Sequence, residues 1–539
     1  MRWLGVWVLL LGGEATAGPF TREPYLQNVT RDRALIVFNV RRPCAATLRL
    51  GRTGEALESV PTSEGPRTQH VLAVKDLQAN TAYDYVVEAC GASLGPFTFR
   101  TAPGPGDAVH FIAVGDSGTG GAMQMRVAEA MTDAAPQLFL ALGDNAYSSG
   151  THAEFQSRFF APLAELLRGA PAFATPGNHE YLTDRGQPYF DNFHLPTNND
   201  QDTERYYSFD WGDAHIVSLD TNCAMGLAGG ACSPKEQREW LVEDLRASQA
   251  RWKLVMMHHP PWSSGGHGID TQFRETFAPL FEQGDVDLVL TGHDHDYERT
   301  FPLVGESVAP KGKRGVTYVV VGTGGAVLRK FPNPLPRWTA VRSDKDYGFL
   351  DVRIHQDVLT ARLVTPDGGV ADEFVLSKRV ALTLAVATSP LKGFAPLTVS
   401  FTAAPSHEGA SIEWRLGKED VVGTGMDHTQ VFPSPGVFEV HARAVLGYSQ
   451  AEKRLLVEVE APPTPPAPPP SNPTQPAPPR PPVAEQVPLE HLQETTGPLS
   501  SGGCSGLAAA PLLLTLLGLH FAKRRGERER RARPPAMKP

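Results

Sequence analysis

Five short polar motifs in the middle of the chain contain residue types that bind metal ions. They are Gly-Asp-Ser-Gly at 115–118, Gly-Asp-Asn-Ala-Tyr at 143–147, Gly-Asn-His-Glu at 177–180, His-His at 258–259 and Gly-His-Asp-His at 292–295. Their donors are oxygen and imidazole groups without a thiolate, which suits iron, zinc or manganese. Two such ions a few ångströms apart serve phosphoryl transfer, because one polarises the phosphate and the other lowers the pKa of a bound water.

Each motif directly follows an apolar run that predicts a buried strand. Continuous apolar runs are typical of strands covered on both faces. The runs are VHFIAV, QLFLAL, PAFAT, AHIVSLD, WKLVMM, VDLVLT and VTYVVVG, between residues 109 and 322. In an open α/β sheet the carboxyl ends of the strands share one edge, so we expect the five motifs to converge there.

Amphipathic stretches between these strands predict covering helices. Residues 154–169 and 233–248 are the clearest cases. The second opens with Ser233 as a predicted N-cap and Pro234 at the first helical position. The alternation of strands and helices predicts an α/β domain over residues 107–376.

No single motif decides the chemistry. A Gly-Asp pair usually marks a turn, and Asn-His after a glycine is often a loop with local hydrogen bonds. A His-X-His pair is more informative, since alternate residues of an extended chain can aim at one ion. All five motifs in order, each after a strand, point to a shared metal centre.

The five motifs resemble the pattern of the purple acid phosphatases, a branch of the calcineurin-like metallophosphoesterases. For residues 107–376 this resemblance implies an α/β domain built as a β-sheet sandwich flanked by helices. Two details favour that branch: Gly118 stands where the wider superfamily has a His, and Tyr147 lies three residues after Asp144. Phenols titrate near 10, so only a strongly acidic ion such as Fe(III) holds a tyrosine ionised at low pH. The competing interpretation of Tyr147 is a packing aromatic residue.

The resemblance implies seven metal ligands. A ferric ion would be bound by Asp116, Tyr147 and His295. A divalent zinc, iron or manganese ion would be bound by Asn178, His258 and His293, and Asp144 would bridge both ions.

The resemblance also implies two catalytic histidines. His179 is expected to contact the phosphate, and His267 to protonate the leaving alcohol. His259 stays outside the metal set, because the family often has an aromatic residue there. We interpret the remaining histidines of this region as structural or surface residues: His152, His194 and His215.

Short alternating runs on both sides of the α/β domain predict β-sandwiches. Residues 22–103 resemble the fibronectin-type-III-like domain of the larger, plant-like enzymes, and residues 380–460, with Trp414 on a strand, resemble a polycystic-kidney-disease-type Ig-like module. The Pro-rich segment 461–500 predicts an extended spacer.

Both chain ends carry targeting features. Residues 1–17 have the charge, apolar stretch and small-residue cleavage site of a signal peptide. Export permits disulfides, so Cys44 with Cys90 and Cys223 with Cys232 are candidate pairs, although four free thiols are the alternative. The tail 501–539 joins Cys504, an apolar run and a basic cluster, and is expected to contact the membrane or sorting machinery.

These features predict a secreted or surface-tethered acid phosphatase that acts on phosphate monoesters. The alternative on the same scaffold is a phosphodiesterase or nucleotide hydrolase with another metal pair. An adhesion or carbohydrate-binding protein is a third interpretation, which leaves the ligand set unexplained. The net charge of −9 argues against a nucleic-acid partner. The sequence does not predict the oligomeric state.

Overall fold

The computed structural model describes residues 18–464 and 466, except 62–64, 231, 311–313, 379–381, 418–419 and 448. The predicted signal peptide, nearly all of the Pro-rich spacer and the predicted sorting tail lie outside the described residues. No helix in the described ranges has both the length and the apolar character that a membrane crossing requires.

The N-terminal region is all β. It has two antiparallel sheets, with strand orders β1-β2-β5 and β4-β3-β6-β7. The strands are β1 Phe20–Gln27, β2 Ala34–Cys44, β3 Ala46–Arg52, β4 Glu58–Val60, β5 Arg67–Val74, β6 Ala82–Ala89 and β7 Ala92–Arg100. A disulfide joins Cys44 at the end of β2 to Cys90 after β6.

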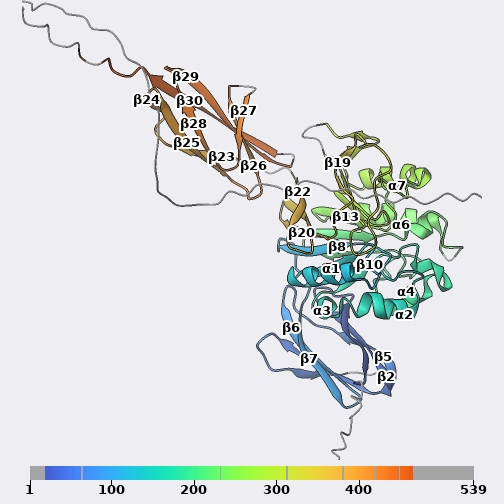
Figure 1. The fold of residues 1–539 in the computed structure, drawn as a ribbon. Helices are drawn as coiled ribbons and strands as arrows, with labels where there is room; N and C mark the ends of the chain where they lie inside the picture. The colour runs from blue at the N-terminus through green and yellow to red at the C-terminus, as the bar shows by residue number, and fades with distance from the viewer. Residues whose placement is uncertain are drawn as a thin grey trace, which may run out of the picture. The chain divides into compact units, whose positions relative to one another are not determined.

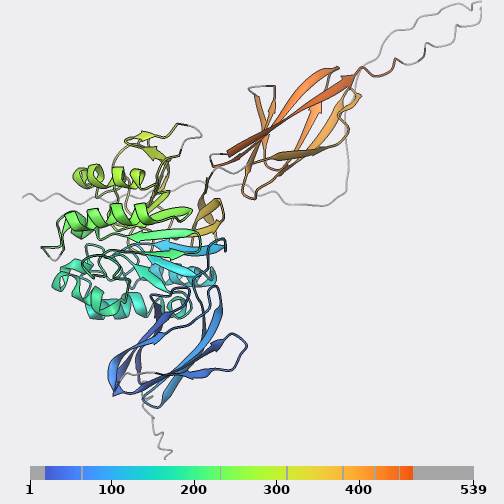
Figure 2. The ribbon, with the colours of Figure 1, turned by 180° about the vertical axis from the view of Figure 1, so that it is seen from behind.

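Two mixed sheets form the central region (Figures 1 and 2). The first has the order β10-β9-β8-β20-β21-β22 and consists of β8 Val109–Val114, β9 Leu138–Ala141, β10 Ala172–Ala174, β20 Phe349–His355, β21 Val358–Val364 and β22 Val370–Ser377. The second has the order β11-β12-β13-β14-β18-β15-β19 and consists of β11 Tyr207–Trp211, β12 Ala214–Ser218, β13 Trp252–Met256, β14 Leu288–Thr291, β15 Tyr297–Thr300, β18 Thr317–Val321 and β19 Thr339–Ser343. The hairpin β16 Leu303–Val304 and β17 Ser307–Val308 stands beside it.

The apolar residues explain why the sheets stack. Side chains from both sheets share one core, for example Phe111 and Leu140 with Leu254 and Leu290. Sheets that pack face to face in this way bury one side of every strand. The motifs therefore converge from two sheets: three follow β8, β9 and β10, and two follow β13 and β14. The two sheets agree with the β-sheet sandwich that the resemblance implies, and they correct the expectation of a single open sheet edge.

Helices cover the outer faces of the two sheets. In Figures 1 and 2, α6 and α7 lie on one side of the stacked sheets and α1 lies on the other. The helices are α1 Ala122–Asp133, α2 His152–Glu154, α3 Ala164–Leu167, α4 Gln187–Asn192, α5 Thr221–Ala224, α6 Pro234–Ala247 and α7 Thr271–Gln283. The 3₁₀ turns are η2 Glu180–Leu182 and η3 Asp184–Gly186, and η1 Phe155–Phe160 is π-helical.

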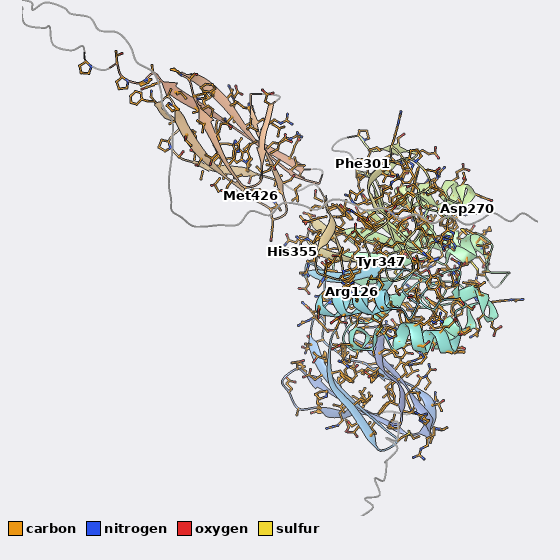
Figure 3. All side chains as sticks on the ribbon, in the orientation of Figure 1. Arg126, Asp270, Phe301, Tyr347, His355 and Met426 are labelled. Carbon is orange, nitrogen blue, oxygen red and sulfur yellow. A yellow bond between two sulfur atoms is a disulfide. The ribbon has the colours of Figure 1, made fainter. Side chains whose placement is uncertain are left out.

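The two long amphipathic stretches fold differently. The Ser233 side chain caps α6 by accepting from the Glu236 amide, and Pro234 opens the helix, as predicted. Asp270, labelled in Figure 3, caps α7 in the same way. The helix predicted over 154–169 is wrong as one element: α2, η1 and α3 divide it. Pro162 lies at the break, where it cannot supply an amide donor to a continuous helix.

The C-terminal region is a second pair of sheets, with orders β23-β25-β28 and β24-β30-β29-β26-β27. Its strands are β23 Leu384–Thr388, β24 Lys392–Phe394, β25 Leu397–Pro405, β26 Ser411–Leu416, β27 Asp420–Thr424, β28 Asp427–Phe432, β29 Gly436–Leu446 and β30 Ser449–Glu460. Trp414 lies on β26, as predicted, and is fully buried between the sheets.

Candidate metal centre

The structure brings all seven predicted ligands together in two overlapping groups. In the first group, the Tyr147 hydroxyl donates to Asp116 Oδ1 over 2.8 Å and lies 3.0 Å from His295 Nε2. His295 Nε2 is 3.5 Å from the same Asp116 oxygen. Three donor atoms from the loops after β8, β9 and β14 thus surround one point.

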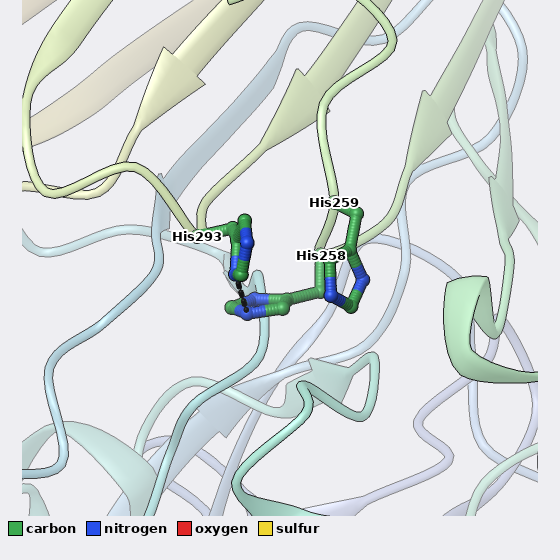
Figure 4. A group of neighbouring side chains, drawn as sticks. All are labelled: His258, His259 and His293. Atoms are coloured by element: carbon green, nitrogen blue, oxygen red, sulfur yellow. Dashed lines mark hydrogen bonds between the residues drawn. The ribbon is translucent and has the colours of Figure 1, made fainter. Parts of the chain in front are cut away.

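The second group lies beside it. His258 Nε2 and His293 Nδ1 are 3.1 and 3.0 Å from Asn178 Oδ1, and 3.3 Å from each other. Figure 4 draws the contact between the two imidazoles as a dashed line. These atoms come from the loops after β10, β13 and β14, so both sheets contribute to the group.

Asp144 lies between the two groups. Its Oδ2 is 3.4 Å from His258 Nε2. Its carboxylate also interacts with the Tyr147 hydroxyl and contributes to raising the pKa of that residue. The backbone amide of His179 donates to the other oxygen, Oδ1, over 3.0 Å. Asp144 therefore faces both groups, and with Asp116 and His258 it forms a second candidate metal-binding cluster.

The spacing of these atoms fits metal coordination. Donors about 2.1 Å from one ion, at right or tetrahedral angles to each other, lie about 3.0–3.4 Å apart. The contacts within each group span 2.8–3.5 Å. The nitrogen and oxygen donors also match the borderline-to-hard metals expected from the sequence.

Backbone carbonyls orient two of the imidazoles. His258 Nδ1 donates to the Leu142 carbonyl over 2.9 Å, and His295 Nδ1 donates to the Val327 carbonyl over 3.1 Å. A carbonyl only accepts, so each ring must carry its proton on Nδ1 and present Nε2 to the centre. Such outer contacts fix the tautomer and the orientation of metal-binding histidines.

The electrostatics of the site also favour bound cations. Burial and the carboxylates of Asp116 and Asp144 raise the pKa of Tyr147 well above its ordinary value. A tyrosinate at this position therefore requires positive charge among these carboxylates. Burial and the neighbouring His259 lower the pKa of His293, which keeps that imidazole neutral and its lone pair free for a metal.

The loops hold their ligands in constrained backbone conformations. Asp116, Asp144 and His293 have φ values of 58°, 51° and 72°, in the left-handed region. The glycines at 177 and 292 permit close approach, since a Cβ there would lie 2.1 Å from Asp144 Oδ1 and 2.5 Å from Asp116 Oδ2. Left-handed backbone at a non-glycine residue costs about 1–3 kcal/mol and persists only where the surroundings enforce it.

Glu180 fixes the backbone of these loops through hydrogen bonds. This buried carboxylate accepts four backbone amides: those of Asp144, Asn145, Ala146 and Gly177, at 2.6–3.2 Å. The sequence placed Glu180 within a motif but assigned it no role. The feature of the sequence that could have pointed to this role is the position of Glu180 directly after His179, the histidine expected to contact the phosphate.

The two predicted catalytic histidines lie at the open side of the centre. His179 Nδ1 donates to the Ser148 carbonyl over 2.5 Å, and its Nε2 is 3.8 Å from Asp144 Oδ2. The His267 ring lies 4.3 Å from the His293 ring and 6.2 Å from the His295 ring, centroid to centroid. Burial and the Arg329 charge lower the pKa of His267.

His259, which the sequence left outside the metal set, lies beside the second group. Figure 4 shows its ring near that of His293. The two ring centroids are 4.3 Å apart, and His259 Nδ1 is 2.7 Å from the Thr221 hydroxyl. Its nitrogen, with those of His258 and His293, falls in one candidate metal-binding cluster. The only feature of the sequence that pointed to this place for His259 was its position directly after His258.

The other three histidines lie outside the centre. His215 bonds through both ring nitrogens to Asp210 and Asp244, at 2.8 Å each. His152 is largely exposed and pairs with Asp191 at 3.3 Å. His194 lies after α4, where its backbone amide donates to Gln27.

Two loops, residues 183–205 and 221–233, lie beside the centre. The Asn222 side chain donates to the Gly177 carbonyl over 3.1 Å, and the Cys223–Cys232 disulfide closes the 221–233 loop. Arg205, from the 183–205 loop, donates to the Tyr181 hydroxyl, which in turn donates to Asp220. Asp220 also accepts from the Cys223 amide over 3.2 Å, so this network joins the two loops to each other.

Comparison with known proteins identifies the domain that carries this site. Residues 109–297 match the calcineurin-like phosphoesterase family, and residues 315–373 match the iron/zinc purple acid phosphatase-like protein C family. Residues 109–373 form a metallophosphoesterase domain of the purple acid phosphatase type.

Relatives of this chain occur in plants and animals. The chain is 28% identical to Purple acid phosphatase 21 of Arabidopsis thaliana over 275 residues, covering 48% of this chain and 58% of the relative. It is 30% identical to Acid phosphatase type 7 of Homo sapiens over 246 residues, covering 40% and 54%. The chain therefore spans little more than half the length of these relatives.

A solved structure has a similar fold. Purple acid phosphatase PPD1 from yellow lupin (Lupinus luteus) seeds superposes with a TM-score of 0.56. The match covers 66% of this chain and 74% of the lupin chain at 20% sequence identity. At that identity the likeness concerns the fold alone.

Proposed function

We propose that this protein is an acid phosphatase that hydrolyses phosphate monoesters at a binuclear centre of Fe(III) and a divalent zinc, iron or manganese ion. The observation that carries the proposal is the pair of donor groups that share Asp144. Asp116, Tyr147 and His295 would hold the ferric ion, and Asn178, His258 and His293 the divalent ion. Bound ions would supply Lewis acidity toward phosphate and a nucleophile near neutral pH.

The residues around the donors would position the ester. His179, held by the Ser148 carbonyl, presents its Nε2 toward Asp144 and can contact a phosphate oxygen there. His267 lies outside His293, on the exposed side, where a leaving alcohol would depart. A general acid at this place typically contributes about 10²–10⁴-fold to the rate.

The test combines metal analysis with a panel of esters. The purified protein should contain two metal ions per chain, with iron as one of them, and should hydrolyse aryl and alkyl monoesters in preference to a bis-aryl diester. A preference for the diester, or a protein without iron, would support the phosphodiesterase alternative instead.

Asp144→Asn sharpens this test, because it removes the charge that faces both groups while keeping the size of the side chain. We expect loss of metal and of activity in this variant. Asp191→Asn is a matched control. Among the ion pairs of the described residues, Asp191 takes part only in the one with the exposed His152. Normal turnover and metal content in Asp144→Asn would refute the assignment.

We further propose that the flanking all-β regions are a fibronectin-type-III-like domain at 22–103 and an Ig-like module at 380–460. The paired antiparallel sheets of each region support this, and an experimental structure would test it.

We also propose that the protein is exported and held at the cell surface by residues 501–539. The two disulfides support an oxidising compartment. A chain truncated after Leu499 should be released in active form, and unchanged retention of that chain would contradict the proposal.

A further inference from the structure

Arg329 lies at the outer edge of the candidate centre. It follows β18 in the loop that also carries Val327, and its backbone amide donates to the His295 carbonyl over 2.9 Å. Its side chain runs past Gly266: a Cβ on that glycine would lie 3.9 Å from Arg329 Cδ. The guanidinium ends at the His267 ring, where Nη1 donates to Nε2.

Two histidine side chains, His293 and His267, separate Arg329 from the other metal-binding atoms. His293 is mostly buried, and His267 packs against it with ring centroids 4.3 Å apart. Arg329 contacts His267 from the exposed side. A guanidinium in this place is too far out to replace a ligand. It is positioned instead to meet whatever is attached to the phosphoryl group.

Most of the hydrogen-bonding capacity of Arg329 is unused. A guanidinium has five N–H donors, and across the described ranges His267 is its side-chain hydrogen-bond partner, with no carboxylate oxygen within 4 Å. The neighbouring Lys330 differs, because it pairs with Asp344 at 3.0 Å. Arg329 thus presents a fixed positive charge with free donors at the mouth of the site.

We propose that Arg329 is a specificity-determining residue that pairs with a second anionic group on the leaving portion of the substrate. This inference rests on the proposed phosphatase function. The favoured substrates would be phosphate esters or anhydrides whose leaving group carries its own carboxylate or phosphoryl anion. Arginine suits this role, since its planar fork binds either anion through two parallel hydrogen bonds.

The experiment compares phenyl phosphate with 4-carboxyphenyl phosphate, whose leaving phenols differ in one carboxylate, and adds pyrophosphate as the phosphoryl case. Each is assayed with the metal-loaded full chain, with Arg329→Gln and with the control Lys330→Gln. A charge-assisted hydrogen bond at a partly exposed site predicts about a tenfold loss of kcat/KM in Arg329→Gln on the anionic substrates. Any effect transmitted through His267 would fall on all three substrates alike, so the loss on phenyl phosphate should be about tenfold smaller than the loss on the anionic substrates. Lys330→Gln should change none of the three by more than about twofold.

Two further readouts separate recognition from a structural role. The wild-type preference for the anionic esters should weaken as salt is raised, because exposed charge pairs are screened. Arg329→Lys should keep part of the preference for the anionic esters that Arg329→Gln loses. Loss confined to pyrophosphate would identify a phosphoryl partner, and loss confined to the carboxylate ester would identify a carboxylate partner.

Equal losses on all three substrates would mean that Arg329 acts on the transferred phosphoryl group. No loss on any substrate would mean that it acts on neither the phosphoryl group nor the leaving group. Either result would overturn the proposal. A wild-type chain that hydrolyses none of the three would contradict the proposed phosphatase function itself. The two failures are therefore distinguishable.

Discussion

Replacing Glu180 by Gln tests whether this carboxylate builds the metal-binding loops. One carboxylate oxygen accepts the amides of Asn145 and Ala146, and the other accepts those of Asp144 and Gly177. A glutamine keeps one oxygen, and its amide group then faces two backbone N–H donors. Each buried donor without a partner costs about 1–3 kcal/mol, so the variant should lose about 2–6 kcal/mol.

Two measurements follow from this loss. A decrease near 3 kcal/mol lowers the Tm of a domain of this size by roughly 6–12 °C in a thermal scan. Metal affinity should fall about 10–100-fold, as for other losses of groups that orient ligands, because the Asp144 backbone is no longer fixed. Both should be measured on the metal-free and the metal-loaded chain.

Glu165→Gln is the matched control for this prediction. Glu165 is a largely exposed helix residue that pairs with Arg168 at 3.2 Å, so its loss should change stability by no more than about 0.5 kcal/mol. If Glu180→Gln melts within about 2 °C of the wild type and retains both metals, the argument from the four amides is wrong.

Two further predictions concern single residues. Tyr147→Phe should abolish visible absorption of the iron-loaded protein while preserving the fold, and a colourless wild-type protein with iron bound would contradict the ferric-tyrosinate assignment. Burial lowers the pKa of His215, but its bonds to Asp210 and Asp244 outweigh this and raise the pKa to about 9. The stabilisation is therefore complete below about pH 6.5 and is lost as the pH rises through 9, by roughly 3 kcal/mol at most. Denaturant titrations should show a smaller loss over this range in His215→Gln, and parallel curves for both proteins would refute the assignment.

The sequence predicted that the candidate donor atoms converge, because each one comes from a loop that follows a buried strand. Apolar runs set the strand ends, and strand ends set where Asp116, Asn178 and His258 emerge. The face-to-face pairing of two sheets was implied by the family resemblance and not by the apolar pattern, since periodicity reports burial and not which sheet a strand joins. The broken helix after Glu154 reflects one proline that the amphipathic pattern conceals.

The groups around the donors were less predictable, for a physical reason. The carbonyls of Leu142 and Val327 orient two imidazoles, and every residue has a carbonyl, so no residue type marks them. Arg329 comes from a loop far along the chain, and its contact with His267 depends on how β18 is placed beside β14. Such contacts exist only once the sheets have stacked.

The left-handed backbone at Asp116, Asp144 and His293 has an evolutionary consequence. Asparagine tolerates this conformation better than most residues and has nearly the shape of aspartate. Exchanging either aspartate for asparagine therefore removes the ligand charge while leaving the loop intact. A descendant of this domain can thus lose its metals in one step, keep its shape, and persist as a binding protein built on a former active site.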